Sequence, residues 1–338
     1  MKPILIGLLA SLFFSATFVL NQSMKFSGGN WMYAASLRFI FMAPFLVAIV
    51  AFRGNLKPLL RDMKARWKTW FGWSFVGFFV MYAPVCFAAE FEPGWLVAGT
   101  WQITIIAGLL VAPLFYKEMS TPDGTVRMRE NIPWRSLPMS LVILVGVALM
   151  QWGNAERLSV SDILFGILPV AVAAFAYPLG NRKMMEACKG KLDTYQRVLG
   201  MTLASLPLWL LLALVAFMQD GPPSAGQTGQ SLIVAVSSGV IATVLFFAAT
   251  DMAKGSAQKL AAVEATQSGE VVFALAGELL LLSVPLPPAI SWAGMLLVVA
   301  GMIMHSMVSG RLPVKPAHKA AASIQEDAIS GHDRPASL

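Results

Sequence analysis

Residues Leu260–Leu282 read LAAVEATQSGEVVFALAGELLLL, a stretch long enough to cross a bilayer as a helix, since about 20 apolar residues span the hydrocarbon core. The stretch also carries polar side chains within an arc of about 120° on a helical wheel: Glu264, Gln267, Glu270 and Glu278. A charged side chain at the bilayer centre costs about 2.5–3.5 kcal/mol on insertion scales. We therefore expect this stripe to face protein or a water-filled cavity and to mark a functional site.

The composition places the whole chain in the membrane class. Of its 338 residues, 57% are hydrophobic and 13% are charged, against about 25% charged in a soluble domain. The mean hydropathy is +0.67. The apolar runs predict an all-α integral membrane protein with ten transmembrane helices: Pro3–Met24, Trp31–Phe52, Phe71–Phe91, Trp95–Tyr116, Leu137–Asn154, Val160–Gly180, Val198–Gln219, Gln230–Thr250, Leu260–Leu282 and Pro288–Val308.

The basic residues predict the orientation of these helices. With the N-terminus inside, 22 of the 25 Lys and Arg fall in inner segments, whereas Lys25 and Arg157 are outer and Arg38 lies within a helix. This bias predicts that both termini are cytoplasmic in a multi-pass protein. It also accounts for the net charge of +7 without a nucleic-acid partner.

The two halves of the sequence resemble each other at offsets of about 160–165 residues. ILIGLL at 4–9 returns as ILFGIL at 163–168, AIVAF at 48–52 returns as ALVAF at 213–217, and FAAE at 87–90 returns as FAAT at 247–250. Because each half holds five helices, an odd number, the second repeat must be inverted, as in many secondary transporters. We predict a first repeat over 1–154, an inverted repeat over 155–309 and a disordered cytoplasmic tail over 310–338.

The polar groups inside the predicted helices are the candidates for binding substrate or protons. Glu270 lies nearest the middle of its helix, where desolvation penalises a charged carboxylate, so it can exchange protons or pair with a cationic substrate. The alternative is a hydrogen-bonded Glu that only joins helices. Arg38 needs a partner at that depth, and Glu278 and Glu90 are the candidates, unless it snorkels to the interface.

Further candidates come from pairing the repeats. Gln102, with Thr100, begins the helix that the repeat pairs with Leu260–Leu282. Pro44 and Pro207 lie in the second helix of each repeat, where a proline removes a backbone hydrogen bond and bends the helix. We treat both prolines as hinge candidates, although proline is also common in membrane helices generally.

Enzymatic, metal and nucleotide chemistry have little support in the sequence. There is no glycine-rich phosphate loop followed by Lys-Ser/Thr, and no His/Cys cluster has metal-ligand spacing. His305 is the histidine near the membrane, without an acid close in sequence, so a lipid-acting enzyme is disfavoured. We expect no enzyme activity, no cofactor and no metal.

Several stretches together resemble the multidrug resistance efflux transporter family of the drug/metabolite transporter superfamily, which has ten helices in two EamA-type repeats. They are LRF at 37–39, YAPVCFAAEFEPGWLVAGTWQ at 82–102, YPLGNRKMM at 177–185, QRVLGMTLASLP at 196–207 and KLAAVEATQSGEVVFALAGE at 259–278. The resemblance covers roughly Pro3–Val308.

The resemblance implies secondary efflux of drugs or metabolites across the bacterial inner membrane, by alternating access and without ATP. Related four-helix exporters use a Glu in their first helix for protons and cationic drugs, but Pro3–Met24 has no acid. Glu270 is the candidate for binding protons and substrate here only because of its position in its helix. An exporter of one metabolite, such as an amino acid or a nucleobase, and a non-transporting sensor remain alternatives. Membrane lipid, a small-molecule substrate and protons are the expected partners, and a monomer or a homodimer fits equally well.

Overall fold

The computed structural model describes residues 2–121, 124–129, 132, 137–153, 163–188, 190–253, 263 and 265–310. Glu264 and residues 311–338 of the predicted tail lie outside the described residues. In the first half the elements are α1 (Lys2–Phe26), α2 (Trp31–Phe52), α3 (Leu56–Ala65), α4 (Trp67–Ser74), η1 (Phe75–Phe79), α5 (Val80–Ala88), α6 (Gly94–Trp101), α7 (Ile103–Leu110), η2 (Ala112–Leu114), β1 (Tyr116–Thr121), β2 (Gly124–Arg129) and α8 (Leu137–Trp152). In the second half they are η4 (Ile163–Ile167), α10 (Leu168–Cys188), α11 (Thr194–Asp220), α12 (Ala225–Val234), η5 (Ala235–Ala242), α13 (Thr243–Ala253), η6 (Thr266–Ser268), α15 (Gly269–Leu281) and α16 (Ala289–Gly310).

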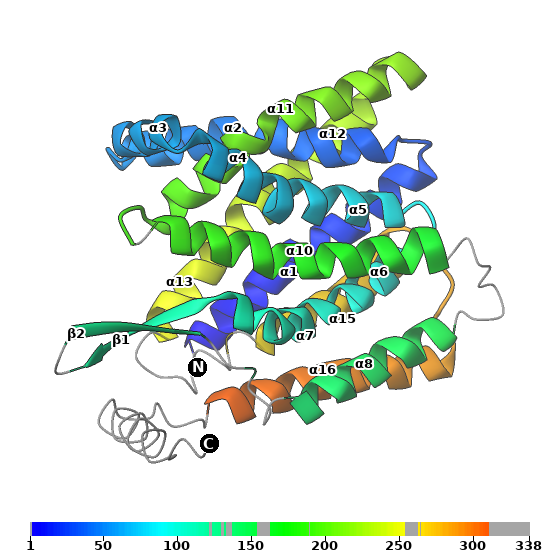
Figure 1. Ribbon diagram of the computed structural model, residues 1–338. Helices are drawn as coiled ribbons and strands as arrows, with labels where there is room; N and C mark the ends of the chain where they lie inside the picture. Colours follow the sequence, from blue (N-terminus) through cyan, green and yellow to red (C-terminus); the bar gives the residue numbers. More distant parts are fainter. Residues whose placement is uncertain are drawn as a thin grey trace, which may run out of the picture.

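Helices of membrane length dominate the structure, as the apolar runs predict. Six stretches of the described chain are long and apolar enough to cross a bilayer: Lys2–Phe26, Trp31–Phe52, Trp67–Ala88, Leu164–Cys188, Thr194–Asp220 and Ala225–Phe246. Shorter apolar helices cover Gly94–Leu110, Pro138–Trp152 and Ala289–His305. Beside these helices, β1 and β2 form an antiparallel hairpin that pairs Tyr116 with Arg129 (Figure 1).

The helix geometry differs from the predicted spans in two places. Within Leu260–Leu282 the described residues from Ala265 to Leu281 are helical, with the 3-10 turn η6 before α15 begins at Gly269. Side-chain hydroxyl groups compete for the backbone carbonyls there: the Oγ of Ser11 donates to the Thr266 carbonyl at 2.5 Å, and the Oγ of Ser268 donates to the Ala265 carbonyl at 2.8 Å. In addition, α10 continues well past Gly180, and α11 begins before Val198.

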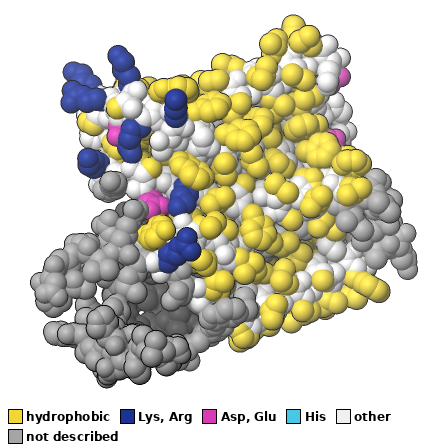
Figure 2. All heavy atoms as spheres, viewed as in Figure 1, with side chains coloured by type: hydrophobic (Ala, Val, Ile, Leu, Met, Phe, Trp, Pro, Cys, Tyr) yellow, Lys and Arg dark blue, Asp and Glu magenta, His cyan; other side chains and the backbone are white. Residues whose placement is uncertain are grey.

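The surface has the apolar belt that a bilayer requires. Figure 2 shows hydrophobic side chains over a broad middle region, with Lys and Arg gathered on the side where α3 lies. Large side chains such as Leu5, Leu211, Leu214 and Leu296 are exposed on this belt. In Figure 1, α1 begins and α16 ends on the same side of the molecule.

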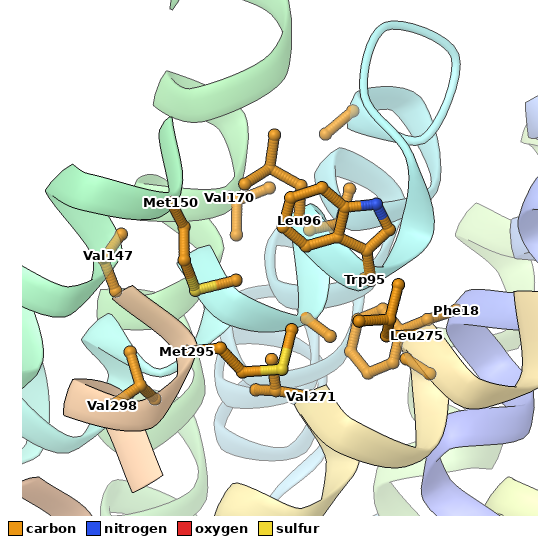
Figure 3. Packing of buried hydrophobic residues seen from close by; sticks show 14 of the residues in the cluster. Phe18, Trp95, Leu96, Val147, Met150, Val170, Val271, Leu275, Met295 and Val298 are labelled. Carbon is orange, nitrogen blue, oxygen red and sulfur yellow. The ribbon is translucent and has the colours of Figure 1, made fainter. Parts of the chain in front are cut away.

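Helices from the two halves of the chain pack against each other. The N-terminal helix α1 contacts η5, α13 and α15, while α10 contacts η1, α5 and α7 (Figure 1). The other major helix pairs are α2 with α11 and α8 with α16. Figure 3 shows how one core joins these elements, with Phe18, Trp95, Met150, Leu275 and Met295 converging between α1, α6, α8, α15 and α16.

A second core surrounds the α2–α11 contact. The rings of Phe39 and Trp209 stack with their centroids 4.4 Å apart, and Tyr82 and Phe78 pack around them. Pro44 and Pro207 lie inside α2 and α11, with both side chains on the exposed faces of these helices. Their proposed hinge role stays a prediction.

The tightest contact of α10 depends on glycine. A Cβ atom added at Gly180 would lie 2.3 Å from the backbone of Gly77 in η1, so a side chain there would push the two helices apart. We predict that Gly180→Ala lowers the free energy of unfolding by about 1–3 kcal/mol, as overpacking of a core does. Gly72→Ala is the matched control, because nothing lies within 4 Å of its added Cβ. Denaturation midpoints of the purified proteins in detergent check this, and an unchanged midpoint for Gly180→Ala would contradict the packing.

Candidate functional site

A polar cavity of about 270 Å³ lies among α1, α2, η1, α5, α10, α11, η5, α13 and η6. Its polar lining consists of Arg38, Tyr177, Asn181, Arg182, Arg197, Thr243 and Gln267. Its apolar lining consists of Phe14, Phe39, Met42, Phe78, Met81, Met185, Val198, Gly239 and Phe246. A few converging polar groups in a mostly apolar pocket are the usual form of a small-molecule site.

Arg38 reaches the cavity from α2 and is held by groups other than those expected. Its Nη2 donates to the Oγ of Ser238 in η5 at 3.0 Å, and its guanidinium stacks on the Tyr82 ring 4.1 Å from the centroid. The predicted ion pair with Glu278 or Glu90 was therefore wrong, because a hydroxyl and an aromatic face stabilise the cation instead. The Nε atom of Arg38 is buried and has no hydrogen-bond partner.

The sequence analysis did not identify two arginines that line the cavity. Arg182 and Arg197 were counted as charges of an inner loop, but they lie on α10 and α11 and line the cavity. Hydropathy ends a helix at the first charge, whereas both helices continue because the charges have an aqueous cavity to face. The Nη1 of Arg182 donates to the Gly108 carbonyl at 3.2 Å. The Arg197 side chain makes no hydrogen bond or ion pair with any residue that the structure describes.

Of the predicted stripe, Gln267 lines the cavity, whereas Glu270 is buried and is not among the lining residues. Glu270 is 6% exposed, and its carboxyl group interacts electrostatically with the Tyr177 hydroxyl. Tyr177 in turn interacts with Arg38 and Arg197. Tyr177 therefore connects the buried carboxyl group with the cationic lining. Binding of a substrate or a proton by Glu270 stays a prediction.

Glu278 lies away from the cavity, at the N-terminus of α6. One carboxyl oxygen, Oε1, accepts the backbone N–H of Trp95 at 2.8 Å, while Oε2 is buried without a hydrogen-bond partner. The first N–H groups of a helix have no partner within the helix, and Pro93, the preceding residue, offers no side-chain acceptor. Glu278 thus acts as a long-range cap, and its charge is also favoured by the helix dipole.

The remaining candidates are spread over the outer part of the α5–α6 region. Glu90 lies in the turn after α5, outside the membrane-spanning helices, where burial raises the pKa of its carboxyl group and the nearby Lys25 opposes that shift. Gln102 is buried at the junction of α6 and α7, and its Nε2 donates to the Ala98 carbonyl at 3.2 Å. Neither residue lines the cavity described above.

Glu92 belongs to a buried polar cluster. It is 1% exposed, and the Nε2 of Gln151 in α8 lies 3.1 Å from its Oε1 and 2.9 Å from the Oγ1 of Thr100. The cluster joins α8 to α6 and the preceding turn. Sequence reasoning missed Gln151 because its partner lies 59 residues away along the chain.

A second, apolar groove of about 410 Å³ is lined by Trp31, Phe79, Ala83, Pro84, Phe87, Leu164, Leu168, Pro169, Val172 and Leu212. None of these side chains is charged, so the groove offers nothing to orient a polar ligand. Among the residues that the structure describes, no group of three His, Cys, Asp or Glu could hold a metal ion. The polar cavity is therefore the candidate site.

Comparison with known families identifies the class of protein. The family described as "EmrE: Putative multidrug resistance efflux transporter" matches residues 1–311. The chain belongs to this family. Together with the apolar helices, the match makes the chain a multi-pass membrane protein.

Two relatives are similar to this chain over most of its length. The chain is 58% identical over 324 residues to the "Uncharacterized protein YjlA" of Bacillus subtilis (strain 168), covering 96% of this chain and 99% of the relative. It is 52% identical over 270 residues to an uncharacterized 42.1 kDa protein of Shouchella clausii, covering 80% of this chain and 70% of that protein. A solved structure titled "Crystal structure of protein" matches with a TM-score of 0.61 at 15% identity, over 92% of this chain and 99% of that one, which shows a shared fold.

The contact of Glu278 with the N-terminus of α6 can be tested as a structural interaction. We predict that Glu278→Ala lowers the free energy of unfolding by about 1–3 kcal/mol, because the buried N–H group of Trp95 loses its acceptor. Glu278→Gln keeps one carbonyl oxygen and should lose less. Denaturation midpoints in detergent measure both variants, and an alanine variant as stable as the parent would refute the capping role.

Proposed function

We propose that this family member is a secondary active transporter that exports small molecules, drugs or metabolites, across the bacterial inner membrane by alternating access. The observation that carries the proposal is the polar cavity, because it is lined by apolar, membrane-length helices from both halves of the chain. A transporter site of this kind lies between two bundles that rock against each other. The absence of a phosphate-binding motif from the sequence favours a gradient over ATP as the energy source.

The pattern of helix contacts supports two inverted five-helix repeats, 1–154 and 155–309. If each helix has its equivalent five helices later, α1 packing on η5 and α13 corresponds to α10 packing on η1 and α5. Under the same equivalence, α2 with α11 and α8 with α16 are pairs of equivalent helices. The π-helical segments also support the repeat. The segment η5 begins about 160 residues after η1, which is the same offset that separates the matching sequence stretches.

Proton coupling is the form of energy use that the site favours. Glu270 is buried beside Tyr177, which belongs to the cavity wall and interacts with Arg38 and Arg197. A change of protonation at Glu270 would therefore alter the electrostatic environment of a side chain that faces the substrate. Both termini lie in the cytoplasm in this proposal, as the distribution of Lys and Arg predicts.

An exporter of one specific metabolite is the second candidate. The favouring observation is the size of the cavity, about 270 Å³, which lies at the low end of ligand pockets and suits a small substrate better than bulky drugs.

The transport proposal is tested with the purified full-length protein in proteoliposomes. Under an imposed proton gradient, we expect at least one candidate drug, amino acid or nucleobase to cross several-fold faster than in protein-free liposomes. Bound ligand without flux would instead indicate a sensor. No acceleration of any candidate would contradict the proposal.

The coupling site is tested by Glu270→Gln, which removes the titrating group and nearly preserves its volume. We expect the variant to lose gradient-driven accumulation, at least tenfold, while counterflow without a gradient is largely retained. Glu186→Gln is the matched control, since this acid lies near the end of α10 and pairs with Lys183. If Glu270→Gln keeps transport with its pH dependence intact, Glu270 is not the coupling residue.

A further inference from the structure

The charged side chains of the cavity are all of one sign. Arg38, Arg182 and Arg197 line it from three different helices, and none of the described lining residues carries a carboxylate. Two acids outside the lining interact with it electrostatically, Glu270 with Tyr177 and Asp193 with Arg197. We propose that this cavity binds small organic anions and that the exported substrate is an amphiphilic anion with a carboxylate, sulfonate or phosphate group. The inference rests on the proposed function, because it names the substrate class of that site.

The hydrogen-bonding capacity left on the arginines supports an anionic ligand. Arg38 uses Nη2 on Ser238, and its buried Nε has no hydrogen-bond partner. The Arg197 side chain interacts electrostatically with Tyr177 and Asp193, but it donates no hydrogen bond to any described residue. A ligand with acceptor oxygens would therefore meet guanidinium donors that are not already engaged. Guanidinium groups match carboxylate, sulfonate and phosphate oxygens with paired hydrogen bonds.

A cationic ligand would meet the opposite situation. Three positive side chains around a cavity of about 270 Å³ repel a cation, and low-dielectric walls strengthen that repulsion. The cavity thus discriminates against organic cations, which a site lined by acidic side chains would select.

The rest of the lining fits the apolar body of such a ligand. Phe14, Phe78 and Phe246 supply aromatic surface, and Met42, Met81 and Met185 supply flexible apolar surface that adapts to different shapes. Asn181, Thr243 and Gln267 add uncharged donors and acceptors.

The test uses three probes that share a naphthyl body and differ in fixed charge: naphthalenesulfonate, the neutral naphthalenesulfonamide, and naphthylmethyl-trimethylammonium. Calorimetry on the full-length protein in detergent gives each Kd, and loaded proteoliposomes give each flux. We expect the sulfonate to bind at least tenfold more tightly than the other two. A cation that binds as tightly as the sulfonate, or no binding of any probe, overturns the inference. This ranking needs no variant, so it does not depend on whether a variant folds.

Substitutions locate the binding. We expect Arg197→Gln to weaken sulfonate binding roughly tenfold or more, the loss typical of a charged hydrogen bond, and Arg197→Lys to weaken it less. Arg61→Gln, at an exposed position on α3, is the control of equal charge change and should bind as the parent does. Unchanged binding in both Arg197 variants would overturn the assignment to this cavity.

The two measurements separate the inference from the proposed function. Selective, Arg197-dependent sulfonate binding without flux supports an anion site and contradicts export. Flux of the cation without preference for the anion supports export and overturns the anion site.

Discussion

A hydrocarbon layer supplies no hydrogen-bond partner, so every polar group of this chain at membrane depth has to be satisfied within the protein or in a cavity. Most of the buried groups meet that demand locally. Glu278 accepts the Trp95 N–H at the start of α6, and Glu92 pairs with Gln151. Some buried atoms keep no hydrogen-bond partner, among them the Oε2 of Glu278 and the Nε of Arg38. Arg38 shares one cavity with Arg182 and Arg197, and this cationic lining is the basis of the proposed anion site.

The same cavity is also where the two halves of the chain meet. Because α1 packs on η5 and α13, and α10 packs on η1 and α5, each half contributes a helix to the packing of the other. Close approach depends on small residues, as at Gly77 and Gly180. Movement of one bundle against the other would repack these contacts, and the residues between the bundles would face first one side of the membrane and then the other.

Hydropathy predicts the apolar helices well because it measures the preference of a side chain for lipid over water. It fails for side chains that face neither lipid nor bulk water, such as those that line a cavity inside the protein. Arg182 and Arg197 looked like loop charges since a cavity inside a membrane protein has no signature in a hydropathy window. The 3-10 turn before α15 arises from hydroxyl groups that bond to local carbonyls. The true partners of Arg38 and Glu278 lie 200 and 183 residues away along the chain, a distance that spacing on one helix cannot reveal.

The central claim is that the two repeats cross the membrane in opposite senses. It is tested most directly by labelling single cysteines with a membrane-impermeant maleimide in a chain whose buried Cys86 and Cys188 are replaced by alanine. Lys57 and Pro222, both exposed, follow the second long helix of each half. We predict that Pro222→Cys is labelled in intact cells and that Lys57→Cys is labelled only after lysis. Labelling of both positions from the same side of the membrane would contradict the inverted architecture.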